Sequence, residues 1–274
     1  MTSKGSNRSN PSTQRPAYRS SNKSLYRAGT QGSGNRMPPI MIWTLAFVAV
    51  AAIVVVSAVY LTQPQPQQTN SAGLNVPIVV TPANITSSGR TLGNPNAPVT
   101  VDLYGDFRCT ACQAFTVGGS EERLVSTYIA TNKAKLVWHD YLIIDQNRRE
   151  TASRDAANAA YCAADQGKFW TMHDWLFANQ SSTEEASAFS ASRLSAIGRA
   201  AGLDMATFQT CLDQGTHDSD ITAANKVAAL TINSTPTVYV NGTAVNKPGQ
   251  GVNYDMIKAA IDAALAAPAP SPAG

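Results

Sequence analysis

The sequence predicts an α/β domain whose sheet-forming halves are separated by an inserted helical block, preceded by a disordered tail and one transmembrane helix. Three observations lead to this prediction. A C-x-x-C pair, Cys109-Thr110-Ala111-Cys112, directly follows a β-prone run at 99–104. Apolar residues take helical spacing from about 149 to 230, and a short strand with a hairpin signal follows at 237–245.

The N-terminal tail is basic and polar. Residues 1–36 carry seven Lys and Arg side chains and no acid, and the first acid of the whole chain is Asp102. These seven charges exceed the formal net charge of +3, so the remainder of the chain is acidic. The basic balance therefore does not indicate a nucleic-acid-binding domain. A tail this rich in Ser, Asn and Arg buries too little apolar surface to fold, so we expect residues 1–39 to be disordered.

Residues 40–61 form an uncharged apolar run of 22 residues. As a helix this run would be about 33 Å long, which matches the hydrocarbon core of a membrane. The alternative is a cleaved signal peptide, but its apolar region would be shorter and a small-x-small cleavage site would follow. All basic residues of the tail precede the run, so we expect a single-pass membrane protein with a cytoplasmic N-terminus and an extracytoplasmic catalytic domain.

Three further boundaries follow from composition. Residues 62–90 begin with a Pro/Gln/Asn-rich stretch and are predicted to be an extracytoplasmic linker, in which 76–80 forms an edge strand. The folded domain is expected over 91–266. Residues 267–274, which are rich in Ala and Pro, are predicted to be a disordered tail.

The first half of the domain reads as strand, helix, strand. The strand at 99–104 leads into a helix that begins at the C-x-x-C pair. Gly118-Gly119 should interrupt that helix, and the acids after Ser120 favour a new helix N-terminus there. A buried strand is predicted over 135–144.

The second half follows a block of three or four helices at 149–230. A strand at 237–240, the turn Asn241-Gly242 and a partner strand at 243–245 predict a β-hairpin. An amphipathic helix at 254–266 closes the domain. The order is a β-α-β unit followed by a β-β-α unit, with the helical block between them.

This arrangement and four sequence segments resemble the DsbA-like thiol-disulfide oxidoreductases of the thioredoxin superfamily. The segments are 92–101 (LGNPNAPVTV), 106–115 (DFRCTACQAF), 163–177 (AADQGKFWTMHDWLF) and 233–242 (NSTPTVYVNG). The resemblance implies a thioredoxin fold with an inserted helical subdomain and a redox-active cysteine pair. It implies no cofactor and no metal.

The chain departs from that family at two places. Family members often have Pro-His or Pro-Tyr between the cysteines, where this chain has Thr110-Ala111, so these two residues are expected to tune the site. Many members also carry a buried Glu six residues before the first cysteine. That position is Leu103 here, with Asp102 beside it on the opposite face of the strand.

The two cysteines of the motif have different expected roles. Cys109, at the helix N-terminus, is predicted to be the exposed nucleophile, because the unpaired N–H groups and the helix dipole favour its thiolate. Cys112 would be the resolving thiol. We expect the pKa of Cys109 to lie below the free value of about 8.5 but above the value of about 3.5 in the strongest oxidants. A purely structural disulfide is the alternative.

The resemblance assigns roles to four other residues. Thr235-Pro236 is expected to be a cis peptide bond that faces the cysteine pair and binds extended substrate by strand addition; an ordinary trans proline is the alternative. Cys162 and Cys211 are expected to form a structural disulfide, as in some family members, or to be two buried free thiols. The three histidines, His139, His173 and His217, are interpreted as packing or surface residues rather than metal ligands.

The predicted function is therefore disulfide formation in translocated proteins. By family analogy, a membrane protein of the DsbB type or one resembling vitamin K epoxide reductase would reoxidise the pair. A thiol reductase, for example one serving cytochrome c maturation, is the main alternative. A copper- or zinc-binding chaperone that uses the two thiols is the alternative from another class.

Overall fold

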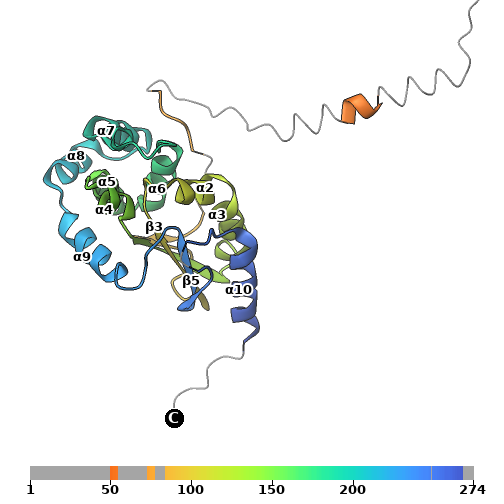
Figure 1. The fold of residues 1–274 in the computed structure, drawn as a ribbon. Helices are drawn as coiled ribbons and strands as arrows, with labels where there is room; N and C mark the ends of the chain where they lie inside the picture. The colour runs from red at the N-terminus through yellow and green to blue at the C-terminus, as the bar shows by residue number, and fades with distance from the viewer. Residues whose placement is uncertain (1–49, 55–72, 78–83, 248, 268–274) are drawn as a thin grey trace, which may run out of the picture. The chain divides into compact units, whose positions relative to one another are not determined.

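The computed structural model describes residues 50–54, 73–77, 84–247 and 249–267. Residues 50–54 are helical, and the rest of the predicted span at 40–61 lies outside the described residues. Within the described part of the chain, no helix has both the length and the apolar character that crossing a membrane requires. The transmembrane helix and the two disordered tails therefore stay predictions. Figure 1 shows the domain that contains the described sheet and its helices.

A mixed six-stranded sheet forms the centre of the domain, in the order β1-β2-β4-β3-β5-β6. The neighbours β3 and β4 run parallel, whereas β5 is antiparallel to β3. The parallel pair and its connecting helices are the predicted β-α-β unit, so the predicted α/β class is confirmed. The strands are β1 (Ser87–Ser88), β2 (Thr91–Leu92), β3 (Val99–Gly105), β4 (Ala134–Asp140), β5 (Thr237–Val240) and β6 (Thr243–Ala244).

The two faces of the central strands differ in burial. Residues alternate strictly between buried and half-buried along β3 and β4, as period-2 side chains do in a strand with one core face. Leu103 pairs in register with Trp138 and lies with it in the main core. A Cβ at Gly105 would lie 2.2 Å from the Trp138 ring, so glycine at the end of β3 makes room for that ring.

The helices after β3 are short and tightly connected. The first, α2 (Thr110–Val117), ends at Gly118, and Gly119 adopts a left-handed conformation (φ 85°) before α3 (Ser120–Leu124) begins. The predicted break and new N-terminus are therefore confirmed. A π-helical segment, η1 (Val125–Ile129), continues from α3 to the loop before β4.

The helical insertion is larger than predicted and begins earlier. The predicted strand at 135–144 ends at Asp140, and a helix begins at Ile143, because side chains from distant parts of the chain accept the backbone N–H groups there. Asn225 accepts from Leu142 N at 2.8 Å and Asp106 accepts from Ile144 N at 3.0 Å. The insertion comprises α4 (Ile143–Arg148), α5 (Ala152–Ala164), α6 (Phe169–Ala178), η2 (Ala186–Phe189), α7 (Ala191–Ala200), α8 (Met205–Gln214) and α9 (Asp218–Ala228).

The C-terminal part follows the prediction closely. Asn241 and Gly242 both have positive φ (48° and 77°), as the tight turn between β5 and β6 requires. The closing helix α10 (Tyr254–Ala266) packs on β3 and β5. The predicted edge strand at 76–80 is wrong for Val76 and Pro77, which lie in no strand, and its other residues lie outside the described part.

Candidate active site

The cysteine pair lies where β3 delivers the chain to α2. Cys109 is the residue before the first residue of α2, with extended backbone angles (φ −70°, ψ 120°), and Cys112 lies one turn inside the helix. Both are free thiols, so the structure represents the reduced pair. Backbone N–H groups of the first turn, those of Ala111 and Cys112, hydrogen-bond to the Cys109 sulfur.

The loop before β5 faces Cys109. The Thr235–Pro236 peptide bond is cis, and the Cys109 thiol donates to the Thr235 carbonyl oxygen with an Sγ–O distance of 3.5 Å. Two segments 126 residues apart in the chain thus meet at the sulfur. This contact also corrects one expectation: Cys109 is only 7% exposed, because the Thr235 loop covers it, whereas Ala111 is the exposed residue of the motif.

The two thiols have opposite pKa shifts. The pKa of Cys109 is lowered to about 6, mainly by a hydrogen bond from the Cys112 thiol and further by the Thr235 side chain and the Cys112 and Ala111 N–H groups, against the effect of burial. Burial and the neighbouring Cys109 raise the pKa of Cys112 well above its ordinary value. Near neutral pH, one sulfur is therefore a thiolate and the other a protonated donor to it.

This asymmetry predicts a pH-dependent stability of the reduced protein. A thiol with a depressed pKa stabilises the folded reduced state above its unfolded pKa of about 8.5, and that contribution is lost as the pH falls through about 6. The stability difference between reduced and oxidised protein should shrink by about 2 kcal/mol from pH 8 to pH 5. Urea unfolding of the reduced and the oxidised protein at each pH measures this difference in the free energy of unfolding. A pH-independent difference would contradict the thiolate assignment.

The acid that many members of the family carry six residues before the motif has no counterpart at that position. Leu103 is buried, and Asp102 lies on the other face of the sheet, where its carboxylate contacts His139 Nε2 at 2.8 Å. A buried carboxyl within the motif segment is that of Asp106, which accepts from Arg108 N at 2.8 Å and from Ile144 N. Burial raises the pKa of Asp106 to about 7. Sequence reasoning quoted Asp106 in the motif without giving it a role.

Arg108 ties the motif to the insertion. Its side chain is 1% exposed and donates to Asp145 at 2.9 Å, to Glu150 at 2.5 Å and to the Glu184 carbonyl oxygen at 2.5 Å. Removing one partner of such a buried ion pair leaves an uncompensated charge, which is strongly destabilising. The sequence showed an arginine beside Cys109, but nothing in its spacing indicated that three segments of the insertion surround it.

The histidines lie apart from the cysteine pair. His173 is fully buried and edge-on to Phe107, and its Nε2 lies 3.8 Å from Glu121, whose other oxygen accepts from Thr116 of α2 at 2.6 Å. Among the described residues, the side chains that lie close enough together to form a group of three metal ligands are Cys162, Cys211 and His217. The group includes neither Cys109 nor Cys112, so the two motif thiols have no third metal ligand in the described part of the chain.

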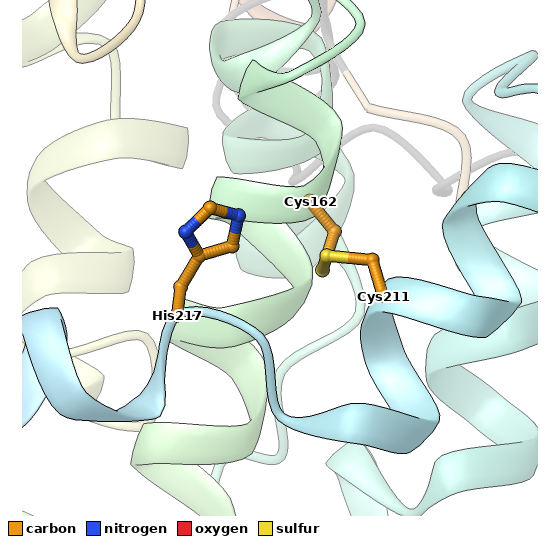
Figure 2. A group of neighbouring side chains, drawn as sticks. All are labelled: Cys162, Cys211 and His217. Atoms are coloured by element: carbon orange, nitrogen blue, oxygen red, sulfur yellow. A yellow bond between two sulfur atoms is a disulfide. The ribbon is translucent and has the colours of Figure 1, made fainter.

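Cys162 and Cys211 are joined by a disulfide that connects α5 to α8, 49 residues apart in the chain. Figure 2 shows the bond with the His217 ring beside it. His217 also contacts Asp165 at 2.9 Å, and its backbone N–H donates to Asn158 at 3.1 Å. The expected disulfide is thus present, and it joins two helices of the insertion. Its purely structural role stays a prediction.

Comparison with known families gives the context for this geometry. The model of the thioredoxin family described as "Thioredoxin" matches residues 86–263, which include the sheet, the motif and the cis-proline loop. The chain belongs to the thioredoxin family. Its fold is accordingly the thioredoxin fold with a helical insertion, of the DsbA-like kind that the sequence resembles.

Two similar proteins match this chain over most of their own length. The chain is 29% identical over 185 residues to the probable disulfide bond formation protein D of Bacillus cereus, covering 65% of this chain and 80% of the relative. The crystal structure of oxidised BdbD from Bacillus subtilis matches with a TM-score of 0.55 and 26% identity, covering 65% of this chain and 92% of BdbD.

Another relative is a much longer protein. The chain is 32% identical to the Na(+)/H(+) antiporter NhaA 1 of Mycolicibacterium gilvum over 155 residues. The match covers 55% of this chain but only 23% of the antiporter's length. The match is thus to a part of a longer protein, and it carries no information about transport by this chain.

Proposed function

We propose that this thioredoxin-family protein is an extracytoplasmic thiol-disulfide oxidoreductase that forms disulfides in translocated proteins through Cys109 and Cys112. The observation that carries the proposal is the reduced pair itself. A sulfur with a pKa lowered to about 6 lies against the cis-proline loop, and a protonated partner lies next to it. The relatives named for disulfide bond formation support the same reaction class.

The exchange begins from the oxidised pair. A substrate thiolate attacks the Cys109 sulfur, a substrate–Cys109 disulfide forms, and the Cys109–Cys112 bond breaks with its electron pair on Cys112, which takes up a proton. A second substrate thiolate then attacks the substrate sulfur and releases Cys109 as a thiolate. The substrate loses two electrons and the enzyme pair gains them. The low pKa makes Cys109 a good leaving group, which favours the second step.

Substrate would bind along the loop that ends in Pro236. The Thr235 carbonyl oxygen already lies at the reacting sulfur, so an extended peptide that pairs with the Thr235 backbone would bring its own cysteine to Cys109. Thr110 and Ala111 form the opposite side of this approach and are half-buried and exposed, respectively. We therefore assign substrate binding to Thr235 and Pro236 and tuning to Thr110 and Ala111.

Location and partners form the remaining part of the proposal. The apolar run at 40–61 would anchor the protein in the cell membrane with residues 1–39 in the cytoplasm, and a membrane reoxidant of the DsbB or vitamin K epoxide reductase type would restore the disulfide. Membrane fractionation followed by protease treatment of intact and opened cells tests this. If the domain resists protease in cells whose outer membrane face is accessible to the protease, the proposed topology is contradicted.

One observation keeps a reductase role as the second candidate. A pKa of about 6 for Cys109 lies between the value of about 3.5 in the strongest oxidant and about 7 in thioredoxin. Equilibration of the pair with glutathione decides the direction. A potential near −120 mV would support the oxidase, and one near −270 mV the reductase.

Thr235→Val should make the pair less oxidising. The Thr235 side chain lowers the pKa of Cys109, and its hydroxyl is otherwise buried without a hydrogen-bond partner. We expect valine, which has nearly the same shape, to raise the pKa of Cys109 by roughly 0.5–1, the size of one modest hydrogen bond to a charged group. Thiolate absorbance followed against pH measures this value. Thr237→Val is the control, because the Thr237 hydroxyl donates to the Ser234 carbonyl oxygen instead.

A further inference from the structure

A carboxylate from the insertion lies at the N-terminus of the active-site helix. The loop between α6 and η2 brings Glu184 to α2, where one carboxylate oxygen, Oε1, is 3.5 Å from both the backbone N and the side-chain Oγ1 of Thr110. Thr110 is the first residue of α2 and directly follows Cys109. The two segments are 74 residues apart in the chain, so this approach is a property of the folded insertion.

Two arginines hold Glu184 in this place. Arg108 donates to the Glu184 carbonyl oxygen at 2.5 Å, and Arg148 of α4 contacts the second carboxylate oxygen, Oε2, at 3.2 Å. The backbone of Glu184 has a positive φ of 58°, which a residue with a Cβ rarely adopts. Contacts at both its backbone and its side chain thus maintain an unfavourable conformation that directs the carboxylate at α2.

The position of this carboxylate has an electrostatic consequence for Cys109. The unpaired N–H groups and the positive end of the helix dipole stabilise one anion at the N-terminus of α2, and the Cys109 thiolate is that anion. A second negative charge at the same end repels the thiolate. The two anions use different donors, because Glu184 accepts from Thr110 N and Cys109 accepts from the Ala111 and Cys112 N–H groups. Arg148 reduces the repulsion because its positive charge contacts the carboxylate.

We propose that Glu184 is a positioning residue of the insertion that weakens the stabilisation of the Cys109 thiolate at the N-terminus of α2, and that Arg148 limits this effect. The inference rests on the proposed function, because it concerns the redox balance of the same pair. The other charged groups around this end are Asp106, Arg108, Asp145 and Glu150, which are joined in the buried network described above and unchanged in the variants below.

The equilibrium with glutathione reports thiolate stability directly. Two glutathione molecules reduce the Cys109–Cys112 disulfide and become one glutathione disulfide, which transfers two electrons to the pair. The protein product is a Cys109 thiolate and a Cys112 thiol, and one proton is released. Any change that stabilises the thiolate therefore shifts the equilibrium toward reduced protein and makes the pair more oxidising.

The test compares Glu184→Gln with Glu185→Gln. Glu185 is the exposed neighbour and its side chain makes no capping hydrogen bond, so this variant makes the same chemical change without touching Thr110. In glutathione buffers at pH 7, we expect E184Q to shift the equilibrium constant toward reduced protein by about threefold to tenfold, equal to about 15–30 mV. The thiolate titration curve should move to lower pH by a matching amount, and E185Q should leave both unchanged.

Arg148→Gln provides an independent arm with the opposite sign. Without its positive charge the Glu184 carboxylate repels the thiolate more strongly, so the equilibrium should move toward oxidised protein. The double variant of Arg148 and Glu184 should have nearly the same equilibrium constant with glutathione as E184Q, because Arg148 acts through the carboxylate. Equal constants for E184Q, E185Q and wild type would overturn the inference. Failure of the proposed function would appear differently, as a wild-type pair that does not exchange with glutathione at all.

Discussion

Replacing Cys109 by serine is expected to reduce thiol-disulfide exchange to the rate of the uncatalysed reaction. A serine hydroxyl forms no disulfide, and Cys112 is buried with a raised pKa, so it cannot take over as nucleophile. The measurement is the oxidative refolding of a reduced, unfolded protein by the oxidised enzyme. Reduction of insulin by the reduced enzyme is measured in parallel, so that the result does not depend on the direction that the pair favours.

The matched variant is Cys112→Ala, which keeps the nucleophile and removes the resolving thiol. It should accumulate covalent complexes in which a substrate cysteine remains bound to Cys109, and reductant should release them. Cys109→Ser should trap nothing. Exchange by Cys109→Ser at a substantial fraction of the wild-type rate would show that the reactive sulfur is elsewhere, with the bridge of Cys162 and Cys211 as the next candidate.

Removing the bridge between Cys162 and Cys211 should cost the domain a large part of its stability margin. A cross-link that closes a loop of 49 residues restricts the unfolded chain, and chain-entropy arguments put its contribution at about 4 kcal/mol. This is a large part of the roughly 5–15 kcal/mol that holds a typical domain folded. Chemical denaturation of the Cys162→Ala/Cys211→Ala protein, with the Cys109–Cys112 pair oxidised in both samples, measures the loss.

Activity separates a structural bridge from a reactive one. At a temperature where the double variant remains folded, its exchange rate per folded molecule should equal that of wild type, because the bridge joins α5 to α8 and neither sulfur contacts the motif. A lower exchange rate per folded molecule at that temperature would contradict the purely structural role. An unchanged free energy of unfolding would contradict the predicted contribution of the bridge to stability.

The site shows where prediction from sequence stops. The strict alternation in β3 and the glycines after α2 are visible in the residues themselves, so these elements were predicted with nearly the observed bounds. The strand at 135–144 was predicted too long, because apolar residues at 141–144 suit a buried strand and a buried helix start equally well. Asn225 and Asp106, which accept the backbone N–H groups there, are distant in sequence.

The amino-acid order by itself predicted the fold class, the hairpin and the closing helix, and it gave the different roles proposed for Cys109 and Cys112. These features depend on backbone preferences and side-chain spacing within a few residues of one another. Only the tertiary structure decided that the Thr235 loop covers Cys109, that the Asp106 carboxyl is buried and that Glu184 reaches the start of α2. Burial and charge depend on which distant segments pack together, and local sequence carries no record of those partners.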